Sequence, residues 1–391
     1  MMFNYIFWLP ACFFVAGSLF LAVDLYYKIV ERYCRFRIGR WKNKESWLYK
    51  YNKVVLKWLP APPLVPTSDN TRLLLWDKIT GKYSRSSVQS FQTAGLILGA
   101  CEYQKNDCRR VINQCADSFI DEKGMWKTKP THVANTMLAY SLLKYSENKN
   151  GIKPAMDCMV SFVNEQVSEE DGLVLYNQSR PYLRYVDTLG LVCPFLVLYA
   201  RTYDESKYTK LAIDQITKFS ELGLYERSFL PFHAYEAQSL WPVGSFGWGR
   251  GTGWFAIAVL DSFLEMEESQ DTKKLKDTIA QMAESYIQFQ RTDGGYGVFL
   301  QDRKTYDSSA TAMLAYFYAS CFSIFREEKY RDVSMRSIEA LIKNTRMDGK
   351  LDNCQGDTKD VGIFSTRHDV LPLAQGMGLR AWSKLQEIPN G

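Results

Sequence analysis

The sequence predicts an all-α fold, an (α/α)6 toroid of six helical hairpins behind an N-terminal membrane-anchor helix. Apolar residues recur mostly with helical periodicity beyond about residue 85. Short Asp-Gly loops follow alternate helices at Gly124, Gly172, Gly294 and Gly349, separated by 48, 122 and 55 residues. This spacing indicates a repeat of about 50–60 residues per helix pair. The loops are rich in aromatic residues, which favours a closed ring over an open solenoid with polar capping repeats.

The composition excludes several classes of protein. The 391 residues are 46% hydrophobic, enough for a large core. The net charge of +5 comes from residues 28–58, which hold ten Lys or Arg and two Glu. The remainder is near neutral, so no nucleic-acid partner is expected. The nine cysteines form no disulfide framework by spacing, and the three histidines are too dispersed for a histidine-rich metal site. A carboxylate site for calcium stays open.

The N-terminal element is predicted to be a single-pass anchor, residues 1–27. Tyr5 to Val23 is an uncharged apolar run of about one membrane span. Pro10 and Gly17 interrupt it, and membrane helices tolerate both. A cleaved signal peptide is the alternative, but no basic residue precedes the run and no clear cleavage site follows it. The basic residues lie after the run, so the positive-inside rule places the main domain in the cytoplasm.

Residues 28–68 are predicted to form a basic juxtamembrane segment and a stiff linker, because Pro60 to Pro66 is proline-rich. Residues 69–391 are then the toroid domain. Helices are expected at about 86–103, 106–120, 132–146, 153–167, 184–201, 206–221, 252–267, 272–291, 306–322, 327–345 and 372–386, with a further one near 45–58.

Two polar segments stand out at the loop ends. Asp187 begins a helix beside aromatic residues that include Tyr185. A carboxyl group in a partly apolar pocket can act as a proton donor, although an N-cap aspartate is the simpler interpretation. His233 follows in Pro231-Phe232-His233-Ala234-Tyr235-Glu236. A single histidine among aromatic residues is more often a half-buried group than a catalyst.

The third segment is Trp248-Gly249-Arg250-Gly251-Thr252-Gly253-Trp254. Tryptophan faces form platforms for sugar rings, and arginine makes forked bonds to carboxylates. A helix that opens behind such a loop directs free N–H groups at an anion. Together these features predict a pocket for an acidic sugar, whereas the simpler interpretation is a helix start packed by tryptophans.

The three segments, in this order, resemble glycoside hydrolase families 88 and 105, the unsaturated uronyl and rhamnogalacturonyl hydrolases. The matching stretches are Val186-Asp187-Thr188-Leu189, His233-Ala234-Tyr235-Glu236 and Trp248 to Trp254, with a later one at Tyr306 to Met313. The resemblance covers about residues 85–388. It implies an (α/α)6 toroid in which an aspartate protonates C4 of a Δ4,5-unsaturated uronic acid and water adds at C5.

By this resemblance Asp187 is the proton donor and the base that activates water. The predicted substrate-binding residues are His132, Tyr185, His233, Trp248, Arg250, Thr252 and Trp254. No metal or organic cofactor is implied, and the expected partners are a uronic-acid-containing glycan and a membrane. The chain departs from the family pattern at Gly249 and Thr252, and residues 131–135 lack the family's second aspartate.

The anchor is similar to those of toroid proteins associated with bacterial surface polysaccharide synthesis, which predicts the bacterial inner membrane as the location. Two alternatives stay open. One is a non-catalytic toroid that binds glycan or acts as a scaffold for a synthesis complex. The other is a sugar epimerase of the N-acylglucosamine 2-epimerase type, for which His233 and His368 are the candidate histidine pair.

Overall fold

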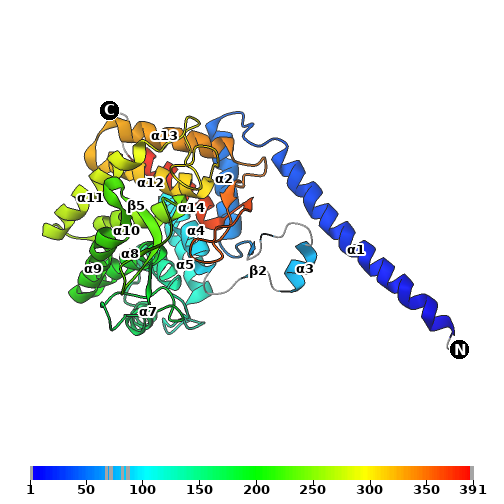
Figure 1. Cartoon of the computed structure of the whole chain (residues 1–391), viewed down its shortest axis with the longest axis horizontal. Coiled ribbons are helices and arrows are strands. Elements are labelled where there is room, and N and C mark those ends of the chain that lie inside the picture. The colour runs from blue at the N-terminus through cyan, green and yellow to red at the C-terminus, as the bar shows by residue number, and fades with distance from the viewer. Residues whose placement is uncertain (1–2, 67–68, 70–73, 81–82, 85–88, 388–391) are drawn as a thin grey trace.

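The computed structural model describes residues 3–66, 69, 74–80, 83–84 and 89–387. Its centre is a closed ring of inner helices, in which each packs on the next and the last returns to the first (Figure 1). These inner helices are α4 (Ser90–Tyr103), α6 (Asn135–Tyr145), α8 (Val186–Tyr203), α10 (Gly249–Glu265), α12 (Ser308–Phe325) and α14 (Pro372–Gln386).

An outer layer covers the ring. Each inner helix from α4 to α12 packs on the outer helix that follows it in the chain. These outer helices are α5 (Cys108–Phe119), α7 (Lys153–Glu165), α9 (Ser206–Leu222), α11 (Gln270–Ile287) and α13 (Glu328–Lys343). The remaining outer position is taken by α2 (Lys44–Trp58), which packs on α14 and α4. The fold is therefore the predicted (α/α)6 toroid, and the predicted helices lie within a few residues of the observed ones.

Helix α2 belongs to the core. Trp47, Tyr51 and Val55 are fully buried, and the Trp47 indole donates to the Thr345 hydroxyl at 3.0 Å. Tyr51 also packs against Gly378 of α14, where a Cβ would meet the Tyr51 hydroxyl. The packed unit therefore begins before residue 69, the boundary that the proline-rich stretch had suggested.

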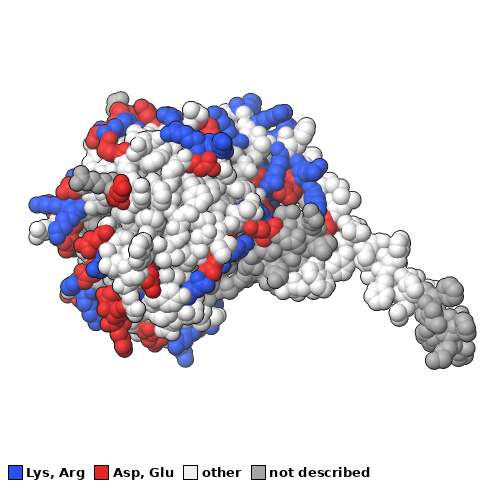
Figure 2. Space-filling model, in the orientation of Figure 1, with Lys and Arg blue, Asp and Glu red and all other residues white. Residues whose placement is uncertain are grey.

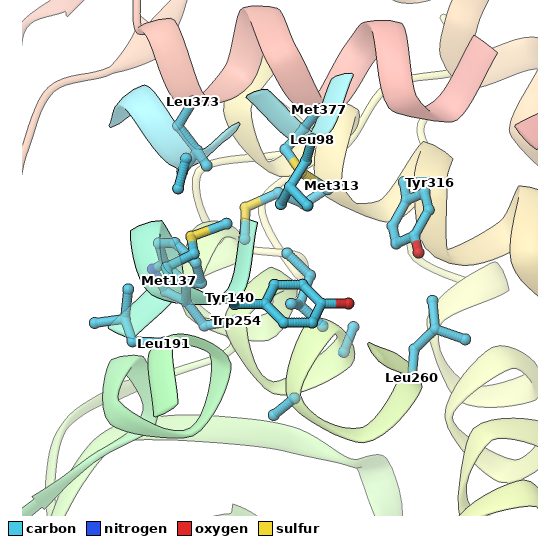
Figure 3. Close-up of a cluster of buried hydrophobic side chains, with 14 of the residues drawn as sticks. Leu98, Met137, Tyr140, Leu191, Trp254, Leu260, Met313, Tyr316, Leu373 and Met377 are labelled. Atoms are coloured by element: carbon cyan, nitrogen blue, oxygen red, sulfur yellow. The ribbon is translucent and has the colours of Figure 1, made fainter. Parts of the chain in front are cut away.

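Apolar side chains fill the centre of the ring. In the close-up of Figure 3, Trp254 of α10 lies with Met137 and Tyr140 of α6 and with Leu191 of α8. At the C-terminal ends of the inner helices, the buried Arg380 guanidinium donates to Asp261 and to Glu102, at 2.7 Å each. It also lies 3.8 Å from the ring centroid of Tyr316. A buried charge needs such partners, so this cluster closes one end of the toroid.

The opposite end, where the inner helices begin, carries short strands that the helical periodicity did not predict. Strand β5 (Leu230–Glu236) pairs with β3 (Leu183–Tyr185), β4 (Leu224–Tyr225) and β6 (Pro242–Phe246). A two-stranded ribbon of β7 (Cys354–Gln355) and β8 (His368–Asp369) flanks the loop 356–367. The remaining short elements are β1 (Val65–Pro66), β2 (Tyr83–Ser84), α3 (Leu74–Ile79) and the 3-10 turns Lys105–Asp107 and Glu226–Ser228.

The N-terminal helix α1 (Phe3–Arg35) projects from the toroid (Figure 1). Within its segment Trp8–Arg35, an 18-residue stretch has a mean hydropathy of 1.8 and is only 6% buried, so the helix is long and apolar enough to cross a membrane. Signal sequences share these properties. The projecting part is largely free of charge in Figure 2. Helix α12 has similar hydropathy but is 83% buried, as expected for a core helix of the ring.

The C-terminal end of α1 is fixed to the toroid by ion pairs. Arg35 donates to both carboxylate oxygens of Asp352, at 2.5 and 2.9 Å, and also to the His368 carbonyl at 3.3 Å. Arg346 donates to the same carboxylate at 2.8 and 2.9 Å. Burial alone would raise the pKa of Asp352, but the two guanidinium groups lower it to about 2. The carboxylate therefore stays charged and ties α1 to the β7–β8 ribbon.

Candidate active site

Most of the predicted site residues meet where the inner helices begin. Tyr185 ends β3 and Asp187 lies in the first turn of α8, so the change from strand to helix places both side chains at the ring opening. His233 lies on β5, whose register pairs its neighbour Ala234 with Tyr185. Trp248 precedes α10, and Arg250 lies in its first turn. Helix N-termini favour anions, so the opening has a favourable field for an acidic ligand.

Asp187 and His233 form the polar pair of the site. His233 Nε2 lies 3.5 Å from Asp187 Oδ2, and their side chains are 3% and 15% exposed. The Gly362 N–H donates to His233 Nδ1 at 3.2 Å, so the neutral imidazole carries its hydrogen on Nε2, facing Asp187. Asp187 Oδ2 has no hydrogen-bond partner among the described residues. It is therefore free to receive or deliver a proton at the opening.

Aromatic side chains surround this pair. Phe364 of the loop 356–367 stacks on His233 at 5.5 Å between centroids and lies 5.4 Å from Trp248. Trp248 lies 5.0 Å from His233. The Trp248 indole donates to Gln355 Oε1 at 2.9 Å. The tryptophan is therefore held by the β7 strand and covered by Phe364, with only 1% of its surface exposed.

Tyr176 connects the predicted residues on the other side. Its ring centroid lies 4.9 Å from that of Tyr185 and 4.9 Å from that of His132. Burial raises the pKa of Tyr176, and the charges of Asp187 and Asp357 raise it further. The hydroxyl therefore stays protonated near two carboxylates. His132 accepts at Nδ1 from the Ala134 N–H at 3.1 Å, and burial lowers its pKa to about 4.

Arg250 lies in the site but its guanidinium is engaged. It donates to the Gln355 carbonyl at 2.7 Å and to the Gly356 carbonyl at 2.9 Å. It also lies 5.0 Å from the Trp248 ring centroid and 4.0 Å from Asp357 Oδ1. Asp307 supports the same loop by accepting from the Gln355 N–H at 2.9 Å. Arg250 therefore holds the start of the loop 356–367 against the helix.

Thr252 and Trp254 lie deeper than the other predicted site residues. Thr252 is fully buried and its hydroxyl donates to the Trp248 carbonyl at 3.1 Å, within the helix. Trp254 is 2% exposed and packs on Phe91, in the cluster of Figure 3. The structure thus brings together six predicted residues, His132, Tyr185, Asp187, His233, Trp248 and Arg250, and places Thr252 and Trp254 beneath them.

Sequence reasoning missed Tyr176, Gln355, Asp357 and Phe364. Three of these come from the segment that follows α13, more than a hundred residues after Trp248. No spacing or periodicity marks them, because their position depends on the closure of the ring. The one available signal was the stretch Tyr306 to Met313, whose Asp307 binds Gln355.

The chain matches the profile described as Glycosyl Hydrolase Family 88 over residues 88–370. A search of curated protein sequences gives no match. Among solved structures, a possible member of family GH105 from Salmonella enterica is 18% identical, with a TM-score of 0.67 over 76% of this chain and 83% of that chain. A family 105 glycoside hydrolase from C. acetobutylicum is 15% identical, with a TM-score of 0.66 over 81% and 99% of the two chains.

The unsaturated glucuronyl hydrolase from Bacillus sp. GL1, which degrades glycosaminoglycan, is 14% identical. Its TM-score is 0.63 over 87% of this chain and 94% of that chain. At these identities the solved structures share the fold with this chain.

Proposed function

The chain belongs to glycosyl hydrolase family 88, and from this premise we propose that it hydrates a Δ4,5-unsaturated uronyl residue at the end of a glycan. The observation that supports this proposal best is Asp187, whose Oδ2 finds no hydrogen-bond partner in the described part of the chain and lies within an aromatic-lined opening. The helix N-termini around it favour an anionic ligand.

In the proposed reaction Asp187 transfers its proton to C4 of the C4=C5 double bond. Water adds at C5 and gives its proton to the Asp187 carboxylate, so the aspartate is regenerated. The product is a hemiketal at C5, which opens to a ketone, and the hemiacetal at C1 then expels the remaining sugar. His233 Nε2 lies 3.5 Å from Asp187 Oδ2 and faces the carboxylate that exchanges the proton.

The activity is tested with the full-length chain in detergent and a panel of oligosaccharides made by polysaccharide lyases. Hydration removes the double bond, so its ultraviolet absorbance disappears as the reaction proceeds. We expect Asp187→Asn to lower the rate by about 100- to 10,000-fold. Asp214→Asn makes the same chemical change on outer helix α9, where the side chain is 51% exposed and pairs with Lys210, and should keep full activity.

If wild-type protein binds a glycan tightly without turnover, the chain is a glycan-binding scaffold instead of an enzyme of this type. If Asp187→Asn is as active as the wild type, the proposed role of Asp187 is wrong.

We also propose that α1 anchors the protein in a membrane with the toroid on the cytoplasmic side, and that the enzyme serves bacterial surface polysaccharide metabolism. The exposed apolar surface of α1 and the basic residues that follow it support this proposal. Flotation with liposomes tests it, since the full chain should float and a chain that begins at Lys28 should not. Recovery of both in the same fraction would contradict an anchor.

A further inference from the structure

The family's second carboxylate is absent from its expected place. Residues 131–135 contain no acid. Val133 is 1% exposed, and the Asn135 side chain accepts from the His132 N–H at 3.2 Å. His132 is neutral above about pH 4 because burial lowers its pKa to about 4. This segment therefore offers neither a carboxylate nor a charge to a substrate near neutral pH.

We propose that Asp357 is the second carboxylate of this active site and that it binds hydroxyl groups of the uronyl residue. This inference rests on the function proposed above. Asp357 lies at the start of the loop 356–367 and its side chain is 21% exposed, so it is accessible from the opening. Asp357 comes from the C-terminal part of the chain, whereas the second acid was expected near residues 131–135.

The placement of Asp357 follows from its contacts. Its Oδ2 accepts from Gln89 Nε2 at 3.0 Å, and its Oδ1 lies 4.0 Å from Arg250 Nη2. Arg250 holds the adjoining Gln355 and Gly356 carbonyls, which fixes the backbone that presents Asp357. The carboxylate is therefore positioned between α4 and α10, at the N-terminal end of both.

Asp357 shares the opening with Asp187. Asp357 Oδ1 lies 4.0 Å from Arg250 in the first turn of α10, and Asp187 Oδ2 lies 3.5 Å from His233. A path of contacts connects them, because Arg250 lies over Trp248 and Trp248 packs on His233, which faces Asp187. A ligand at the opening is thus flanked by two carboxylates.

The two aspartates have different surroundings and so suit different tasks. Asp187 Oδ2 accepts no hydrogen bond from the described residues, which suits a group that exchanges a proton. Asp357 has an amide donor at 3.0 Å and a guanidinium at 4.0 Å, which hold its carboxylate in place. A charged carboxylate only accepts hydrogen bonds, and the hydroxyl groups of a sugar are donors. Asp357 therefore binds and orients the sugar while Asp187 performs the proton transfer.

The test combines binding and turnover in the full-length protein. In an Asp187→Asn background, which holds substrate without converting it, binding of an unsaturated uronyl disaccharide is measured by calorimetry with and without Asp357→Asn. We expect Asp357→Asn to weaken binding by about 10- to 100-fold, the loss for hydrogen bonds to a charged group. In the otherwise wild-type protein the same change should raise KM by a similar factor and lower kcat less. Asp214→Asn is the matched control and should change neither value.

Thermal melting without ligand separates binding from structure. An unchanged melting temperature with weakened binding supports the proposal. Unchanged binding in Asp357→Asn, or a loss of binding that parallels a lower melting temperature, overturns it. If Asp187→Asn loses turnover while Asp357→Asn keeps both the wild-type KM and the wild-type affinity, the proposed function stands and only the role of Asp357 is removed. A wild-type protein that neither binds nor converts the disaccharides would overturn the proposed function and this role together.

Discussion

At the residue scale, the segment from Trp248 to Trp254 divides between the site and the core because of where α10 begins. The sequence predicted a helix from about residue 252, with a glycine-rich loop before it. The helix instead begins at Gly249. Trp248 lies just before this start with non-helical backbone angles, whereas Trp254 lies in the second turn of α10, so the two tryptophans face different directions. The types and the order of the site residues could be predicted from the sequence. The burial of Thr252 and Trp254 could not, because it depends on where α10 begins, and the three glycines gave no helix signal there.

Trp254 is therefore predicted to contribute to stability through core packing. Its side chain is 2% exposed, and a Cβ on Gly190 would collide with its ring. We expect Trp254→Ala to lower the free energy of unfolding by about 3–5 kcal/mol, as for other large core truncations. Denaturant unfolding measures this value. A loss below about 1 kcal/mol, together with lost glycan binding, would restore the platform role predicted from the sequence.

His132 makes the stability depend on pH. The pKa of His132 is lowered to about 4 in the folded protein by burial, against 6.5 when exposed. Below pH 6.5 the unfolded chain binds a proton that the folded one does not, so stability is full above pH 6.5 and is lost as the pH falls toward 4. This difference corresponds to about 3 kcal/mol. The free energy of unfolding, measured by denaturant at several pH values, should therefore fall less between pH 7 and pH 4 in His132→Gln than in the wild type. An equal fall in both proteins would contradict the buried neutral histidine.

At the element scale, long helices were predictable and short strands were not. Eighteen-residue helices such as α8 and α12 carry a sustained apolar pattern. Strands β7 and β8 have two residues each, too few for any period to show. Yet β7 carries Gln355, and the loop between β7 and β8 carries Asp357 and Phe364. The scaffold of the site was therefore readable from the sequence, while the C-terminal loop that completes it was not.

The N-terminal boundary of the folded unit is a prediction at the same scale. Helix α2 fills an outer position of the ring, and Trp47, Tyr51 and Val55 are fully buried. A chain that begins at residue 59 should fail to show a cooperative thermal transition, whereas one that begins at Lys28 should melt near the full-length protein in detergent. Circular dichroism during heating measures both. A cooperative transition in the shorter chain would contradict the structural role of α2.

At the scale of the whole molecule, the projecting helix and the active site are linked through the β7–β8 ribbon. Arg35 at the end of α1 binds Asp352 just before β7 and the His368 carbonyl on β8. The loop between these strands carries Asp357 and Phe364. The Arg380 cluster lies at the opposite end of the ring, where the inner helices end. The end of the toroid that carries the site is therefore the end to which α1 is tied.

This link predicts that Arg35 protects the loop 356–367 from proteolysis. Arg35→Ala removes the bonds to Asp352 and His368, while Arg346 still pairs with Asp352, so we expect the loop to lose about 1–2 kcal/mol of protection. The fraction of molecules in which the loop 356–367 is open should rise about 5- to 30-fold, and the rate of trypsin cleavage at Lys359 or Arg367 should rise with it. Lys44→Ala is the matched control, because it removes an exposed pair with Glu339 in which both side chains are 48% exposed. Equal cleavage rates in the wild type and Arg35→Ala would show that the β7–β8 ribbon holds its loop without the bonds from Arg35. The link between α1 and the loop that carries Asp357 would then be wrong.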